Sequence, residues 1–443
     1  MTQGHPLPLI LQFMLPVLLG QVVQQTYNMV DAMIVGRALG ANALASVGAS
    51  SSVQFMVLGF CSGMCDGSSI PIAQRFGAGD LHSMRRYIFH LVRIISCIAA
   101  GLTLLTALLC PLIIRVLHTP ADITSDANLY LLIIFLGLPF TFFYNAQASL
   151  LRAVGNSKIP FLFLAISAGL NIFLDLFCVV VLKWGCAGAA IATVTSQALS
   201  GFMCLVYIIK KMDVLKPRKE DREWSWISAR NILSMGLPMG LQFSITAIGS
   251  MVMQAANNGL GSLYVSAYTA ANRYEQLIMC PYVALSSSVA TYVGQNYGAG
   301  KIDRIKAGVR QTFIMGNLYG LVFGSLMAVT GRAAASLFLS GDAGQVLDVS
   351  AQFLRIIGFS FWIVTSVNVF RPAMQSMGYP IHAIFSGVME MAARTIFSIV
   401  ATPLIGFLAI CLVHQVAWIT AGIYVICMYR YLMKKIERQN IEN

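Results

Sequence analysis

An apolar stretch near the start of the chain, residues 7–36, carries a stripe of polar side chains that includes a carboxylate. The members of the stripe recur every three or four residues and so share one face of a helix: Gln21, Gln24, Asn28 and Asp31. A charge at the centre of a bilayer costs about 2.5–3.5 kcal/mol on insertion scales, so it needs a reason. Hydrogen bonds between helices would explain the amides. They explain Asp31 less well, because the stretch contains no Lys or Arg to pair with it.

A second carboxylate stands in the apolar stretch 159–182. Asn171 and Asp175 are four residues apart, on one helix face, and this stretch has no internal cation either. If two such carboxylates met in a dry cavity, they would share a proton or hold a cation between them. Amide and hydroxyl oxygens of Asn145, Asn171 and Thr193 would suit a hard ion such as Na⁺. The spacing alone does not establish that these helices meet.

Three further acidic residues lie in apolar stretches. Glu390 has Arg394 four residues later, so a structural ion pair explains it as well as a function does. Glu275 has Arg273 nearby, and we include it with Gln24 and Asn28 among the candidates for a substrate cavity. Asp66 is expected near the cytoplasmic end of its helix, where it can reach water.

The elements that hold these residues are predicted to be membrane-spanning helices. The 443 residues are 57% hydrophobic and 10% charged, whereas a soluble domain has about 25% charged residues. Apolar runs of about 20 residues cross the hydrocarbon core, and lipid forces them to be helical. Twelve runs are predicted: 7–36, 43–73, 88–117, 128–149, 159–182, 186–209, 231–258, 262–293, 309–339, 346–371, 381–405 and 406–430.

The positive charges follow the loops between these runs. With the N-terminus inside, twenty Lys and Arg fall in cytoplasmic loops and tails, and four fall outside. This positive-inside pattern predicts that both termini are cytoplasmic, and it argues against a nucleic-acid partner despite a net charge of +12.

The polar segment 210–230 divides the chain. We expect an N-lobe over 1–209, a cytoplasmic linker over 210–230, a C-lobe over 231–430 and a cytoplasmic tail over 431–443.

The two halves repeat backbone markers. Leu-Pro pairs end at Pro16 and Pro238, 222 residues apart (238 − 16). Gly-Ala-Gly loops follow runs two and eight, at Gln74–Gly79 and Gln295–Gly300. The repeat predicts two pseudo-symmetric six-helix lobes with a cavity between or within them. We interpret Pro16 as a hinge, because proline removes a helical hydrogen bond and permits a kink.

Several motifs together resemble the multidrug and toxic compound extrusion (MATE) transporters, in particular the prokaryotic branch. The similarity covers nearly the whole chain and includes both Gly-Ala-Gly loops. Its other segments are Val30–Arg37 (VDAMIVGR), Ala43–Gly48 (ALASVG), Leu151–Gly155 (LRAVG), Gly185–Thr193 (GCAGAAIAT) and Ala270–Glu275 (AANRYE). The resemblance implies twelve helices in two lobes and export of cationic or amphipathic drugs, driven by Na⁺ or H⁺.

The resemblance also implies an N-lobe cation site at Asp31, Asn171 and Asp175, with Asn145 and Thr193 as further members. Some relatives carry an acidic residue early in the seventh helix, but residues 242–246 (QFSIT) contain none, so no C-lobe cation site is expected there. We expect a multi-pass protein of the cell membrane, monomeric, with small drug-like substrates. Apart from the coupling ion it should need no cofactor, and no zinc site is expected because Cys61 and Cys65 have no histidine nearby.

Two alternatives remain. A flippase for lipid-linked oligosaccharides would need a cationic cavity, but runs one and two contain no internal Lys or Arg. An intramembrane enzyme is disfavoured because HExxH, GxSxG and GxxxxGK[ST] are absent from the sequence. The sequence does not decide between Na⁺ and H⁺, because carboxylates and amides serve both.

Overall fold

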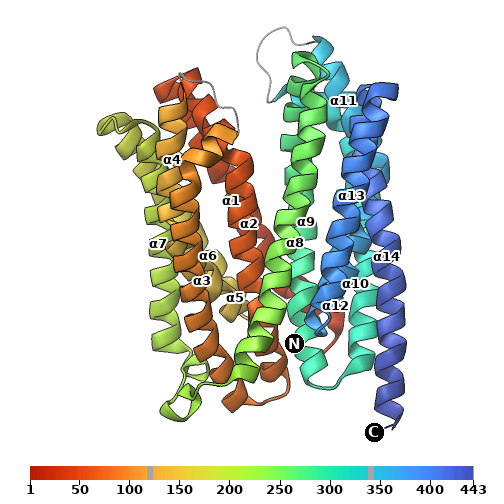
Figure 1. Ribbon diagram of the computed structural model, residues 1–443. Helices are drawn as coiled ribbons and strands as arrows, with labels where there is room; N and C mark the ends of the chain where they lie inside the picture. The colour runs from red at the N-terminus through yellow and green to blue at the C-terminus, as the bar shows by residue number, and fades with distance from the viewer. Residues whose placement is uncertain (117–122, 338–343, 443) are drawn as a thin grey trace. The chain divides into compact units, whose positions relative to one another are not determined.

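The computed structural model describes residues 1–116, 123–337 and 344–442, and these ranges are helical with no β-strand. The helices of each half run roughly side by side (Figure 1). Their bounds are α1 Pro6–Leu39, α2 Ala41–Gly77, α3 Leu81–Val116, α4 Thr124–Leu136, α5 Leu138–Ala153, α6 Lys158–Asp175, α7 Gly185–Lys211, α8 Trp226–Asn258, α9 Ser262–Gly298, α10 Ile302–Ser336, α11 Gly344–Ser360, α12 Val364–Ser376, α13 Pro380–Ile405 and α14 Phe407–Glu442. Short π or 3₁₀ turns occupy Leu176–Val181, Asp213–Leu215, Lys219–Arg222 and Phe361–Ile363.

The predicted set of twelve spans is confirmed, with one span broken. Eleven helical segments of the described chain are long and apolar enough to cross a membrane, and α4 with α5 forms a twelfth span that bends by 44°. The bend falls at Gly137, and Pro139 two residues later lacks the N–H that would continue the helix. A side chain at Gly137 would collide with Val194 of α7, so the bend also permits close packing. The expected ends of runs three and nine, at 117 and 338–339, lie outside the described residues.

The described chain forms two compact units. The N-unit is Leu15–Leu241, and the C-unit combines Met1–Met14 with Gln242–Asn443. Two helices are therefore divided: α1 passes from the C-unit into the N-unit, and α8 passes from the N-unit into the C-unit. The divisions lie close to Pro16 and Pro238, where each helix lacks one backbone hydrogen bond. The prolines that mark the sequence repeat thus also mark where the chain changes units.

Glycines allow the closest helix contacts inside each unit. In the N-unit, a Cβ on Gly67 of α2 would lie 2.5 Å from the Met235 carbonyl oxygen and 2.9 Å from the Gly236 Cα of α8. In the C-unit, a Cβ on Gly320 of α10 would lie 2.5 Å from the Trp362 Cα. Both glycines belong to GxxxG spacings, Gly59–Gly63–Gly67 and Gly316–Gly320–Gly324, which permit such close approaches.

The linker after α7 is not fully solvated, because part of it is buried against α3. Asp221 is 1% exposed, and its carboxylate lies 2.6 Å from His82 Nδ1 and 3.2 Å from Arg85 Nε of α3. The Ser225 amide donates to His90 Nε2 at 2.8 Å. The linker therefore packs on α3, because the N-terminal half of α3 presents basic side chains to its carboxylate.

The ends of the C-unit meet at the turn between α9 and α10. The Met1 amino group donates to Gln295 Oε1 at 2.7 Å, and Arg304 donates to the Met1 carbonyl oxygen. Near the other end of the chain, Glu437 of α14 pairs with Lys306 of α10. Both termini therefore lie on the side of the basic Gly-Ala-Gly loop (Figure 1), in agreement with the predicted cytoplasmic termini.

Candidate functional site

The two carboxylates predicted to matter come from α1 and α6 of the N-unit. Asp31 lies two turns before the end of α1. Asp175 is the last residue of α6, and a π-helical turn, Leu176–Val181, begins directly after it. Single π-helical turns are rare in proteins and are frequently found at functional sites. The π turn ends the regular helix at Asp175, and the carboxyl that it follows is wholly buried, at 0% exposed.

The structure brings Asp31 and Asp175 together. Their carboxyl groups are close enough to interact directly. Apart from this carboxyl–carboxyl contact, neither oxygen of Asp175 has a hydrogen-bond partner in the part of the chain that the structure describes, and neither polar atom of the Asn171 side chain one turn earlier has one. A buried carboxyl without a donor is costly unless it is neutral or binds a cation. The arrangement can therefore hold a shared proton or a small cation with oxygen ligands.

Two tyrosines complete the surroundings of this pair. Tyr27 lies one turn before Asp31 and shares a hydrogen bond with Gln24, and both carboxylates act on it electrostatically. Tyr130 of α4 also faces both carboxylates and shares a hydrogen bond with Gln54 of α2. Sequence reasoning missed Tyr27, Tyr130 and Gln54, because aromatic residues and isolated amides are common in all membrane helices. Four helices of one unit thus contribute polar groups here.

The other residues predicted for the cation site or the substrate cavity make no recorded contact with the Asp31–Asp175 pair. Asn145 of α5 donates to the Thr141 carbonyl oxygen at 2.9 Å, and its Oδ1 accepts from Ser62 at 3.5 Å. Thr193 of α7 is half-buried, and its carbonyl oxygen accepts from Ser196. Asn28 is exposed at the surface of the described chain. The structure therefore joins Asp31, Asn171 and Asp175, with Gln24 beside them through Tyr27, and records no contact from Asn145 or Thr193 to either carboxylate.

Asp66 has a structural partner. Arg152 of α5 lies 2.7 Å from its carboxylate, which also accepts from Ser149 at 2.5 Å. Asp66 was expected to reach water, and its side chain is indeed 40% exposed, but the ion pair ties α2 to α5. Arg152 belongs to the LRAVG segment, so this part of the family resemblance has a packing explanation.

The C-unit holds a second group of buried charges. Glu390 of α13 lies 2.8 Å from Arg394 Nη2, as its spacing predicted, and 2.8 Å from Arg371 Nη2 of α12, which the sequence did not indicate. Glu275 of α9 is 5% exposed, whereas Arg273 is exposed. Two residues apart on a helix point in different directions, so Arg273 is not the partner of Glu275. The charged side chain that acts on Glu275 is Arg394.

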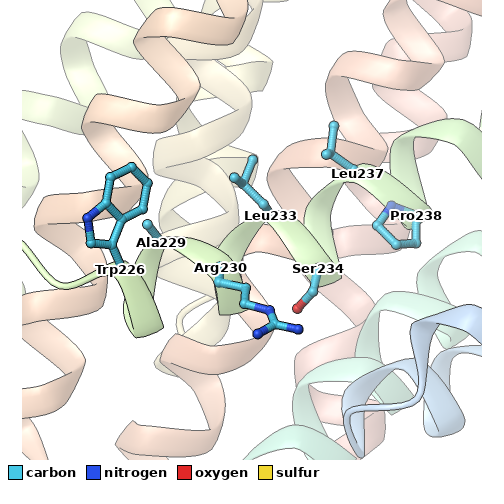
Figure 2. Close-up of a pocket in the computed structure, with 7 residues that line it drawn as sticks. All are labelled: Trp226, Ala229, Arg230, Leu233, Ser234, Leu237 and Pro238. Carbon is cyan, nitrogen blue, oxygen red and sulfur yellow. The ribbon is translucent and has the colours of Figure 1, made fainter.

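A groove of about 520 Å³ runs along the first turns of α8 in the N-unit. Figure 2 shows its lining from one helix: Trp226, Ala229, Arg230, Leu233, Ser234, Leu237 and Pro238. The lining is largely apolar and contains no carboxylate. This groove is therefore not where a cation would be exchanged.

Comparison with known proteins identifies the family. The MatE family model matches residues 16–177 and 238–404, and the second match begins 222 residues after the first (238 − 16), at the proline that marks the repeat. The probable multidrug resistance protein YpnP of Bacillus subtilis (strain 168) is 30% identical over 367 residues, which is 83% of this chain and 81% of YpnP.

Solved structures show the same fold. A crystal structure of MATE in complex with MaL6 covers 99% of this chain, with 98% of its own chain matched, a TM-score of 0.92 and 21% identity. A MOP superfamily transporter from Pyrococcus furiosus Vc1, described as having a reversed polarity of its binding pocket, covers 98% of both chains with a TM-score of 0.91 and 21% identity. With the family model matched in both halves, this chain belongs to the MatE family of membrane transporters.

Proposed function

We propose that this protein is an antiporter that exports drugs or other amphipathic or cationic small molecules in exchange for inward Na⁺ or H⁺. The observation that carries the proposal is the pair of Asp31 and Asp175, which lies in the N-unit with no basic side chain acting on it in the described part of the chain. A buried acidic pair without a fixed counter-ion must take up a mobile one.

The exchange of that cation would drive alternating access. A ligand shifts a conformational equilibrium only by the difference between its affinities for the two states. Asp31 and Asp175 lie on different helices, so the energy of the pair depends on how α1 and α6 are placed. With a cation bound the carboxylates can stay close, and without one they repel each other. Pro16, close to the point where α1 changes units, is the proposed hinge for this movement.

The proposed cargo follows from the relatives. YpnP is named a probable multidrug resistance protein, and other matched proteins are named multidrug export proteins. A flippase with a cationic cavity fits less well. The basic residues of α1 and α2 are confined to their last turns, at Arg37 and Arg75. We propose that the monomer is the transporting species, because the coupling pair lies within one unit of one chain.

The test is drug export from cells or vesicles that contain Asp31→Asn or Asp175→Asn protein. Both substitutions keep the side-chain shape and remove the charge, so we expect export to be abolished while membrane insertion and folding are retained. Asp303→Asn is the matched control, because its carboxylate is fully exposed on α10 and should be dispensable. Drug export at the wild-type rate by both N-unit variants would refute the proposed function.

A further inference from the structure

One face of α13 is polar along most of its length. Five residues spaced four apart form this face, which we call the α13 stripe: Ser386, Glu390, Arg394, Ser398 and Thr402. None of them is more than 9% exposed. Sixteen residues of helix rise about 24 Å, most of a hydrocarbon core that is about 30 Å thick. Burying polar side chains over this length in a membrane costs free energy, so we expect them either to have hydrogen-bond partners or to serve a function.

The middle of the α13 stripe is an ion-pair network with an uncompensated positive charge. Glu390 accepts from Arg371 and from Arg394, at 2.8 Å in each case. Arg371 also donates to Ser386, and Arg394 donates to Ser250 of α8. Two guanidinium groups share one carboxylate, so this network carries a net charge of +1.

Glu275 is the group that can balance this charge. It lies buried on α9, and Arg394 is the charged side chain that acts on it electrostatically. Glu275 Oε2 and Arg394 Nε are both buried, and neither has a hydrogen-bond partner in the described ranges. Buried polar atoms that served only stability would be expected to have hydrogen-bond partners. The unpartnered carboxyl oxygen of Glu275 is therefore not explained by packing alone.

The other elements around Glu275 offer no alternative counter-ion. α9 packs against α10, α11 and α12. Among the described residues, α10 and α11 contribute no buried charged side chain, and the cation that α12 contributes is Arg371. From α14, His414 is buried, interacts electrostatically with Arg394 and has no partner at Nε2. Among the described residues, Arg394 is therefore the basic side chain that acts on Glu275, and the other titratable group that interacts with it is Tyr268, two turns earlier on α9.

We propose that Glu275 is a second ion-exchange site, located in the C-unit and selective for H⁺ over Na⁺. When Glu275 is ionised, the set of Arg371, Arg394, Glu390 and Glu275 is neutral. When Glu275 takes up a proton, the set becomes +1. A Na⁺ ion at Glu275 would have to lie beside the guanidinium of Arg394, and it would leave the same net charge while adding a direct cation–cation repulsion. A proton binds covalently to the carboxyl oxygen and avoids that contact.

The α13 stripe supplies polar groups on both sides of this site. Ser386, which accepts a hydrogen bond from Arg371 of α12, lies toward the cytoplasmic start of α13. Ser398 and Thr402 lie toward its other end, and both hydroxyls are buried without a partner among the described residues. In the hairpin of α13 and α14, which turns at Gly406, Ser398 is eight residues before the turn and His414 eight residues after it, so the two lie at similar depth. Buried hydroxyls and an imidazole are groups that water-mediated proton transfer uses.

This inference deepens the proposed coupling of export to a cation, but its test does not depend on transport. Purified protein in lipid nanodiscs is titrated from about pH 5 to about pH 9, a range that includes the values documented for buried glutamates, and the carboxylic acid C=O stretch is followed by infrared difference spectroscopy. The background carries Asp31→Asn and Asp175→Asn, which remove the two carboxyls of the proposed coupling pair. We expect a buried-carboxyl band that titrates, disappears in Glu275→Gln, persists in the control Glu437→Gln and does not change when Na⁺ replaces K⁺.

Arg394→Gln in the same background tests the origin of the selectivity. Glu390 keeps Arg371 as its partner, so the variant retains one half of the ion-pair network. Without the guanidinium, Na⁺ should compete with the proton and abolish the Glu275 band. The proposal is overturned if no titrating band depends on Glu275, or if Na⁺ removes that band while Arg394 is present. Failure of Asp31→Asn and Asp175→Asn to block export would instead count against the proposed function.

Discussion

Removal of the charge on Glu390 should destabilise the C-unit far more than removal of a similar charge at the surface. Glu390→Gln keeps the size of the side chain, but it leaves Arg371 and Arg394 facing each other. Their side chains are 12% and 6% exposed, and that of Glu390 is 7% exposed, so water cannot replace the lost carboxylate. The amide oxygen can accept one hydrogen bond, and the amide nitrogen would meet a second donor.

The size of the effect follows from burial. Breaking a buried ion pair by removing one partner costs about 3–5 kcal/mol, which corresponds to a population change of roughly 10²- to 10³-fold or more. Asp348→Asn is the matched control, because the Arg332–Asp348 pair has a similar separation of 3.1 Å but side chains that are 62% and 67% exposed. Exposed pairs contribute about 0–1 kcal/mol.

The assay is equilibrium unfolding in mixed detergent micelles, followed by circular dichroism, for wild type and both variants. We expect the free energy of unfolding to fall by about 3–5 kcal/mol for Glu390→Gln and by less than about 1 kcal/mol for Asp348→Asn. Addition of Arg394→Leu to Glu390→Gln should recover part of the loss, because it removes one of the two uncompensated cations. Equal and small effects for the two single variants would refute the reasoning that burial makes the Glu390 network strong.

Three further predictions concern the fold and the hinge. Gly67→Ala should lower the free energy of unfolding by about 1–3 kcal/mol through overpacking, because its Cβ would lie 2.5 Å from a backbone oxygen. A Cβ on Gly169 would have nothing within 4 Å, so Gly169→Ala should be neutral or stabilising in the same unfolding assay. Asp80→Ala should cost about 1 kcal/mol, because Asp80 accepts the Ser83 amide at the start of α3. Hydrogen bonds from Ser83 lower the pKa of Asp80 below its usual 3.8. The stabilisation by Asp80 is therefore present above pH 3.8 and is lost as the pH falls through the lowered pKa. The difference between Asp80→Ala and wild type should vanish when unfolding is measured in acid. Pro16→Ala restores a helical hydrogen bond and should slow export without lowering the amount of folded protein, as measured by initial rates of drug efflux.

The spans of this protein could be predicted because lipid imposes one rule on every segment. Apolar runs of sufficient length must be helices, and the basic loops orient them. The break at Gly137 was not predicted, although Pro139 stands in the middle of run four, because proline kinks many membrane helices without dividing them. The division of α1 and α8 between the two units was not predicted either. It depends on contacts between distant parts of the chain, which the periodicity of the sequence does not show.

The candidate site was predicted only in part. Asp31 and Asp175 were identifiable because each is a carboxylate in an apolar stretch without a nearby cation, but their meeting depends on tertiary packing. Glu390 and Arg394 were found through their spacing on one helix. The pairing of Arg371 with Glu390 and the electrostatic effect of Arg394 on Glu275 were missed, because these residues lie on different helices and no local pattern links them. Charge pairs within a helix are readable from sequence, whereas pairs between helices need the fold.

The measurement that tests the central claim most directly is drug export from proteoliposomes under separately imposed Na⁺ and H⁺ gradients. Wild-type protein should export drug against its gradient when at least one of the two ions flows inward. Asp31→Asn and Asp175→Asn should lose that coupling under both gradients, while Asp303→Asn should keep it. Export by the wild type that is independent of both gradients, or coupled export by both N-unit variants, would contradict the account.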